Sequence, residues 1–303
     1  MEKNTVKEPG GTTSKGLLLI LLAAVLFSLM AMCTKLSARA GVPHGEITFM
    51  RFASGFITVG VFALLGVVKI EPEEKKWLYL RGVLGSAAMV CYFFALSNGT
   101  MKNSVLLNSS YPVFIVLFSS LFIGEKVRGY VYPLLVVSLV GIALVIKPQP
   151  GHVEPADVMA LVSAVLAGLA ILVLRRARYR NNTWTILLYL NGIGMFVVGG
   201  FVIADPVWPA PAAWLPILGV CFFANAAQMV LTYAYKYARA SDGGVVIMSQ
   251  VVFSTLIGYF LFSERIDAVF IIGAVLVLGC GGALTLLASE HRQPADVAVN
   301  KQG

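Results

Sequence analysis

The sequence predicts an all-α integral membrane protein with ten transmembrane helices, arranged as two inverted five-helix repeats with both termini in the cytoplasm. Three observations support this prediction. Hydrophobic residues make up 58% of the 303-residue chain and charged residues only 13%, about half the charged share of a soluble domain. The hydrophobic residues gather in ten separate segments, and parts of the first five match the last five. A soluble core could not bury this much apolar surface, so the bilayer is expected to be the solvent.

Each apolar segment has roughly the 20 residues that a membrane-spanning helix needs. An isolated strand cannot satisfy its backbone in lipid, so each segment is expected to be a helix. The segments are 16–38, 47–68, 77–97, 103–123, 129–147, 156–175, 184–204, 213–236, 243–262 and 266–288. Basic residues precede the first segment as in a signal peptide, but nine more segments follow it, so it is expected to be an anchor.

The predicted domain organisation follows these segments. It consists of a cytoplasmic N-terminal tail at 1–15, a first repeat at 16–147, an outer linker at 148–155, a second repeat at 156–288 and a cytoplasmic C-terminal tail at 289–303.

The 23 Lys and Arg residues predict the orientation. Most of them flank the segments on the side of the two termini, and few lie on the other side. The positive-inside rule therefore places both termini in the cytoplasm and the chain, as a multi-pass protein, in the plasma (inner) membrane. The net charge of +8 is explained by this orientation. No loop offers the broad basic surface that phosphate neutralisation needs, so no nucleic-acid partner is expected.

An internal repeat relates the two halves. Superposed without a gap, Ala95 meets Ala234, Ser110 meets Ser249 and Glu125 meets Glu264. Each half holds five segments, and an odd number inserts the halves with opposite orientation. Inverted repeats are the architecture of many secondary transporters, which bind substrate near the midplane where the repeats meet.

Two apolar segments end in an acid–base pair, Gly-Glu-Lys at 124–126 and Ser-Glu-Arg at 263–265, and each is followed by one more span. Together with YPVFIVLFSSLFIGEK at 111–126 and Arg51 early in the second span, this pattern resembles EamA domains of the drug/metabolite transporter superfamily. The resemblance implies ten helices, termini inside, and alternating access around a central cavity lined by spans 1, 3, 4, 6, 8 and 9. The proline often found in the second repeat is Val251 here, so a straighter ninth helix than the fourth is expected.

The fourth span carries polar residues near the middle of the bilayer: Asn108, Ser109, Ser110 and Tyr111, followed by Pro112. Proline removes one helical N–H and clashes with the carbonyl four residues back. The freed backbone groups need partners, and such a break is tolerated where it faces protein or a wet cavity. Serine and asparagine also join neighbouring helices, but the cluster as a whole favours a cavity lining.

Polar residues at similar depth in other spans complete a candidate substrate pocket. Ser249 and Gln250 are the repeat mates of Ser110 and Tyr111, and Asn225 and Gln228 share one helix face. The predicted substrate-binding residues are Tyr92, Asn108, Ser110, Tyr111, Asn225, Gln228, Ser249 and Gln250. These side chains describe a pocket of amides and phenols without fixed charge, suited to zwitterionic or ring-bearing metabolites.

A few charged residues are candidates for gating or charge pairing, together with Pro112. Glu125 and Glu264 lie at span ends, and Glu46 opens the second span from outside, where its likelier role is stabilising a helix N-terminus rather than proton coupling. Arg51 lies deeper and needs a partner, either a protein carbonyl or carboxylate or an anionic part of the substrate. Lys35, near the outer end of the first span, is expected to extend to the headgroups.

Three functions compete. The favoured one is a secondary carrier of a small polar organic metabolite, amino-acid-like or nucleobase-like. The alternative is a non-transporting membrane receptor or scaffold of the same fold. An enzyme is not expected, because no span offers paired carboxylates, a histidine cluster or an activated nucleophile. No metal or cofactor is expected; the expected partners are a small-molecule substrate and the bilayer, and small residues such as Gly82 and Gly85 leave a homodimer open.

Overall fold

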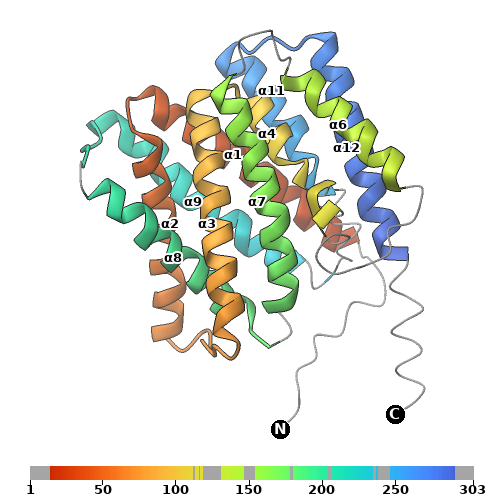
Figure 1. The fold of residues 1–303 in the computed structure, drawn as a ribbon. Helices are drawn as coiled ribbons and strands as arrows, with labels where there is room; N and C mark the ends of the chain where they lie inside the picture. The colour runs from red at the N-terminus through yellow and green to blue at the C-terminus, as the bar shows by residue number, and fades with distance from the viewer. Residues whose placement is uncertain are drawn as a thin grey trace, which may run out of the picture.

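The computed structural model describes residues 14–111, 113–115, 117–118, 131–146, 154–177, 180–203, 206–234, 237 and 246–290. Within these ranges the regular structure is entirely helical (Figure 1). Predicted site residues Pro112 and Glu125 lie outside the described residues.

Helices occupy the described part of every predicted segment. The first repeat contains α1 (Ser14–Arg39), α2 (His44–Leu64), α3 (Lys75–Asn98), α4 (Met101–Asn108) and α6 (Val131–Ile146). The second contains α7 (Pro155–Ala177), α8 (Thr183–Val202), α9 (Trp214–Ala234), α11 (Gln250–Phe262) and α12 (Ala268–Glu290).

Six of these helices are long and apolar enough to cross a membrane in the part of the chain that the structure describes. They are the first three helices of each repeat: α1, α2, α3, α7, α8 and α9. Shorter apolar stretches lie within α6, α11 and α12. The structure thus shows a multi-span helical protein, and the count of ten spans stays a prediction.

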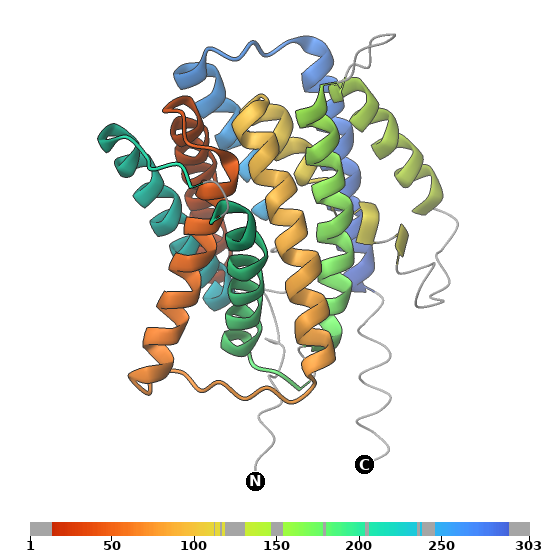
Figure 2. The same cartoon turned by 60° about the vertical axis from the view of Figure 1, so that its left-hand side comes forward.

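The contacts between the two repeats come in matched pairs. Helix α3 packs on α7 as α9 packs on α1, and α4 packs on α7 as α11 packs on α1. Helices α2 and α8, α4 and α11, and α6 and α12 each pack on their own counterpart. Figures 1 and 2 show α2, α8 and α9 at one side, α6 and α12 at the other, and the remaining helices between them. A twofold relation between two similar units produces this reciprocal pattern.

The fourth helix of each repeat is interrupted at the same point. Helix α4 ends at Asn108, a turn follows at Ser109 and Ser110, and helix resumes at Tyr111. In the second repeat a turn at Met248 and Ser249 precedes α11. The ninth span is therefore interrupted as the fourth is, although Val251 in place of proline predicted a straighter helix there than in the fourth span.

The hydrogen bonds at the two turns correspond one for one. The N–H of Ser110 donates to Leu107 over 3.1 Å, and that of Ser249 donates to Val246 over 3.0 Å. The carbonyl oxygens of Ser110 and Ser249 each accept a bond from the residue three positions later. These three-residue bonds are the tighter turns of a 3₁₀ helix, so the backbone break is a property of both repeats and does not depend on the proline.

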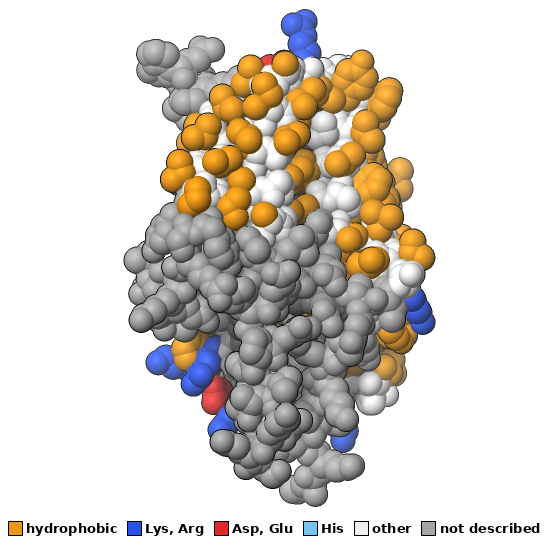
Figure 3. Space-filling model, turned by 90° about the vertical axis from the view of Figure 1, so that its right-hand side faces the viewer, with side chains coloured by type: hydrophobic (Ala, Val, Ile, Leu, Met, Phe, Trp, Pro, Cys, Tyr) orange, Lys and Arg blue, Asp and Glu red, His pale blue; other side chains and the backbone are white. Residues whose placement is uncertain are grey.

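Hydrophobic side chains cover the outside of the helix pair α6 and α12. Figure 3 shows orange side chains over much of the upper part of this face. Val136, Leu139, Ile271, Ile272 and Val275 are all about half exposed or more. A monomeric soluble protein rarely exposes such a continuous apolar surface, so this face fits contact with lipid.

Candidate functional site

The structure brings predicted pocket residues of both repeats together near the two helix breaks. Tyr92 of α3 is buried, and its hydroxyl lies near the Gln250 side chain at the start of α11 without forming a hydrogen bond among the described residues. The Gln250 carbonyl oxygen lies 3.1 Å from the hydroxyl of Ser28 on α1. Three helices thus present polar groups beside the second-repeat break. We call Ser28, Tyr92 and Gln250 the central group.

The first-repeat break has its own polar contacts. The Asn108 amide donates to the hydroxyl of Ser163 on α7 over 2.6 Å. Ser110 is buried and donates to the Leu107 carbonyl, whereas its repeat mate Ser249 has a shielded hydroxyl with no partner among the residues that the structure describes. Tyr111 is half-buried. An unpaired buried hydroxyl costs free energy, so Tyr92 and Ser249 offer groups that a ligand could satisfy.

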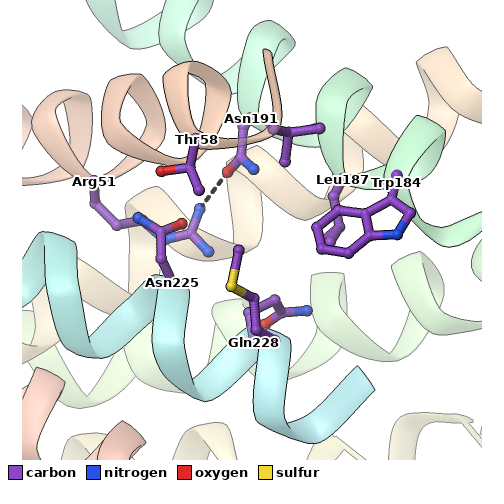
Figure 4. A pocket seen from close by; sticks show the side chains of 9 residues that line it. Arg51, Thr58, Trp184, Leu187, Asn191, Asn225 and Gln228 are labelled. Atoms are coloured by element: carbon purple, nitrogen blue, oxygen red, sulfur yellow. Dashed lines mark hydrogen bonds between the residues drawn. The ribbon is translucent and has the colours of Figure 1, made fainter. Parts of the chain in front are cut away.

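Asn225 and Gln228 belong to a second group, between α2, α8 and α9. Together with Arg51, Thr58, Trp184 and Asn191 they line a narrow cavity of about 10 Å³ (Figure 4), room for about one water molecule. The Arg51 Nη1 donates to the Asn191 side-chain oxygen over 3.0 Å, and the Asn225 amide donates to the Ser54 hydroxyl over 3.1 Å. The sequence predicted no charge beside these amides, and the structure places a guanidinium there.

Glu264 joins three segments at the end of the bundle predicted to face outward. Its carboxylate lies 2.7 Å from the Lys35 ammonium of α1 and accepts the backbone N–H groups of Met101 and Lys102 at the start of α4. Lys35 also donates to the Gly99 carbonyl over 2.7 Å. The side chains of Lys35 and Glu264 are only 10% and 5% exposed, so Lys35 does not extend to the headgroups: a specific buried carboxylate binds it instead.

Glu46 is buried in the first turn of α2, where it was expected to stabilise the helix N-terminus. One carboxylate oxygen accepts the backbone N–H of Val207 over 2.7 Å, and the other has no partner among the described residues. Glu46 thus ties the start of α2 to the segment that precedes α9.

A family model matches the chain twice, at residues 14–147 and 154–286, and its description is the EamA-like transporter family. The chain belongs to this family. Both matches together cover the helices of both repeats, so membership rests on nearly the whole chain rather than on one motif.

Several relatives from the same comparisons carry transporter names. The pseudopaline exporter CntI of Pseudomonas aeruginosa is 31% identical, over 87% of this chain and 93% of its own length. A riboflavin transporter of Rhizobium johnstonii is 23% identical over 92% of each chain. A solved crystal structure matches with a TM-score of 0.64, covering 92% of this chain and 98% of the other at 22% identity, which shows a shared fold.

For this EamA-like chain, the structure adds site residues that the sequence did not single out. They are Ser28, Ser163 and Asn191. Ser163 and Asn191 are polar residues inside apolar segments, and such residues usually face a bundle interior. The sequence therefore indicated that Ser163 and Asn191 face the bundle interior. Which helix each side chain faces depends on how the two repeats pack, which the sequence did not show.

Proposed function

We propose that this protein is a secondary active transporter that moves a small polar organic metabolite, amino-acid-like or nucleobase-like, across the plasma membrane by alternating access. Membership of a transporter family and the transporter names of its relatives support membrane transport of a small molecule. The two inverted repeats, at 16–147 and 156–288, would be the units that rock against each other.

The observation that carries this proposal is the matched break in α4 and α11. Both breaks lie beside buried polar side chains, and the two helices pack on each other. Irregular backbone inside a membrane is tolerated where it faces protein or lines a cavity. The breaks in α4 and α11 would expose backbone N–H and C=O groups to a ligand. Each break is also a point at which its helix can bend.

The Lys35–Glu264 pair supports a gating role for this end of the bundle. It connects α1, the start of α4 and the segment after α11, which come from both repeats. In an alternating-access cycle the repeats separate at one end while they meet at the other, so this pair would form in the state closed at the outward end and break in the opposite state.

A thermal-shift screen of the purified protein tests the proposal. Amino acids, nucleobases, polyamines and sugar phosphates are added to protein in detergent, and a hit is then assayed for uptake into reconstituted vesicles. A ligand at 100 times its dissociation constant stabilises the fold by about 2.7 kcal/mol. The expected result is a shift confined to one chemical class, matched by uptake of that compound.

A double variant distinguishes a carrier from a receptor or scaffold. Asn108→Ala with Gln250→Ala is expected to abolish both the shift and the uptake, while Tyr259→Phe on the exposed face of α11 leaves both unchanged. Uptake that survives the double variant unchanged would place the substrate site elsewhere. Binding without any uptake by the native protein would favour the receptor.

A further inference from the structure

Two arginine side chains lie on neighbouring helices of the bundle, Arg51 on α2 and Arg81 on α3. Arg51 of α2 is 5% exposed, and Arg81 of α3 is half-buried, with the Nε atom of each shielded from solvent and without a hydrogen-bond partner among the described residues. A Cβ added at Gly85 would overlap the Arg81 Nη1 and lie 2.7 Å from Leu190 of α8. The Arg81 guanidinium therefore lies beside the turn of α8 that holds Asn191, the hydrogen-bond partner of Arg51, and the two positive charges repel each other. Placing like charges together away from water is costly unless an opposite charge joins them.

No described carboxylate supplies that opposite charge. Among the described residues, neither guanidinium has a carboxylate within salt-bridge distance. The three buried carboxylates are engaged elsewhere: Glu46 with Val207, Asp157 with Asn103, and Glu264 with Lys35. Arg51 instead has neutral neighbours, the Asn191 side-chain oxygen and the ring of Phe52.

The surroundings of the pair suit an anionic ligand. Arg51 extends from α2 into the cavity between Asn191 and Asn225, with Gln228 beyond them (Figure 4). The Asn191 side chain bonds to Arg51 through its oxygen, so its amide nitrogen can donate to a ligand oxygen alongside the guanidinium. On α3, Gly85 leaves the space that the Arg81 guanidinium occupies, because a Cβ at that position would overlap it.

We propose that Arg51, supported by the charge of Arg81, binds a carboxylate group of the transported metabolite. The inference rests on the proposed function and narrows its substrate class to organic anions or zwitterions. Planar guanidinium groups bind carboxylates with two parallel hydrogen bonds. The cavity has room for about one water in this conformation, so a whole metabolite enters only after α9 moves relative to α2 and α8.

Matched ligand pairs test the charge requirement without altering the protein. Nicotinate is compared with nicotinamide, and benzoate with benzamide, by thermal shift of the full-length protein in detergent. The expected result is stabilisation by the carboxylate of at least one pair and roughly 10- to 100-fold weaker binding of its amide. Equal responses within every pair, including no response at all, would overturn the proposal.

Substitutions then test which arginine is responsible for the preference for carboxylate ligands. Arg51→Gln is expected to abolish the preference for the carboxylate, and Arg51→Lys to keep part of it, because the charge remains but the fork of donors is lost. Arg180→Gln removes an exposed arginine and serves as the control. If Arg51→Gln is unstable, Arg81→Gln provides the second variant, with a smaller loss expected. Full preference in a folded Arg51→Gln protein would overturn the assignment.

The two hypotheses fail differently. If vesicles take up an uncharged or cationic metabolite through the central group, the anion proposal is wrong and the transporter proposal stands. If carboxylates bind at Arg51 but no compound crosses the membrane, the anion site stands and the transporter proposal fails.

Discussion

The ammonium group of Lys35 lies 2.7 Å from the carboxylate of Glu264, and both side chains are almost fully buried. The pair joins positions 229 residues apart in the chain. The same carboxylate accepts the first backbone N–H groups of α4, which have no partner within their own helix. One side chain therefore neutralises a buried cation and caps the short helix that precedes the break at Ser109.

Breaking this pair is expected to destabilise the protein strongly. Glu264→Gln leaves Lys35 buried without a counter-charge, a change that costs about 3–5 kcal/mol in buried pairs. Thermal or denaturant unfolding in detergent measures the effect. The matched control is Glu74→Gln, which removes a half-exposed pair with Arg180 and is expected to cost less than about 1 kcal/mol. Equal losses from the two variants would contradict the structural role of Glu264.

The repeat-related serines are expected to respond differently to alanine. Ser110→Ala removes a buried hydrogen bond to the Leu107 carbonyl and is expected to cost about 1 kcal/mol. Ser249→Ala removes a shielded hydroxyl that has no partner within the described part of the chain, so the free energy of unfolding is expected to stay the same or rise. Unfolding of both variants side by side measures the difference. A larger loss from Ser249→Ala would show that its hydroxyl is already satisfied.

Tyr92→Phe separates ligand binding from stability. The Tyr92 hydroxyl is buried and makes no hydrogen bond to any residue that the structure describes, so its removal is expected to leave the fold as stable as before. If the ligand satisfies this hydroxyl, affinity is expected to fall by roughly 1–3 kcal/mol. Titration of the screened ligand measures it, with Tyr259→Phe on the exposed face as the control. Unchanged affinity in Tyr92→Phe would remove Tyr92 from the site.

Close packing beside the first break predicts a glycine requirement at position 168 of α7. A Cβ there would lie 2.9 Å from the Cβ of Phe114 and 3.2 Å from the backbone nitrogen of Ile115. Gly168→Ala is therefore expected to cost about 1–3 kcal/mol through overpacking. Gly60→Ala, in open space on α2, is expected to be neutral. Unfolding of both variants tests this contact, and a neutral Gly168→Ala would contradict it.

The helices were largely predictable from the sequence, because each apolar segment has a length and composition that only a helix can satisfy in lipid. The break after Asn108 was predictable from the local sequence as well. The break at Ser249 was not, since Val251 in place of a proline suggested a straighter helix than the fourth. The repeat alone carried that signal, because Ser249 aligns with Ser110.

The contacts of the charged residues could not be predicted. Lys35 resembled a residue that reaches the headgroups, and only the packing of α1 against α4 and α11 shows its partner. In the same way, Arg51 and Arg81 lie on different helices, and nothing in the sequence indicates that their side chains are near each other. The packing of α3 against α8 brings Arg81 toward Arg51. Side-chain partners across helices depend on crossing geometry, which apolar periodicity does not encode.

The central claim is that the polar groups beside the two helix breaks bind a metabolite that the protein carries across the membrane. The most direct test is uptake of a metabolite mixture into vesicles that contain either the native protein or the Asn108→Ala, Gln250→Ala variant, read by mass spectrometry. We predict that at least one metabolite accumulates only with the native protein, while the variant remains folded and unfolds at a modestly lower temperature because it loses the hydrogen bond from Asn108 to Ser163. Equal accumulation in the two sets of vesicles would contradict the account.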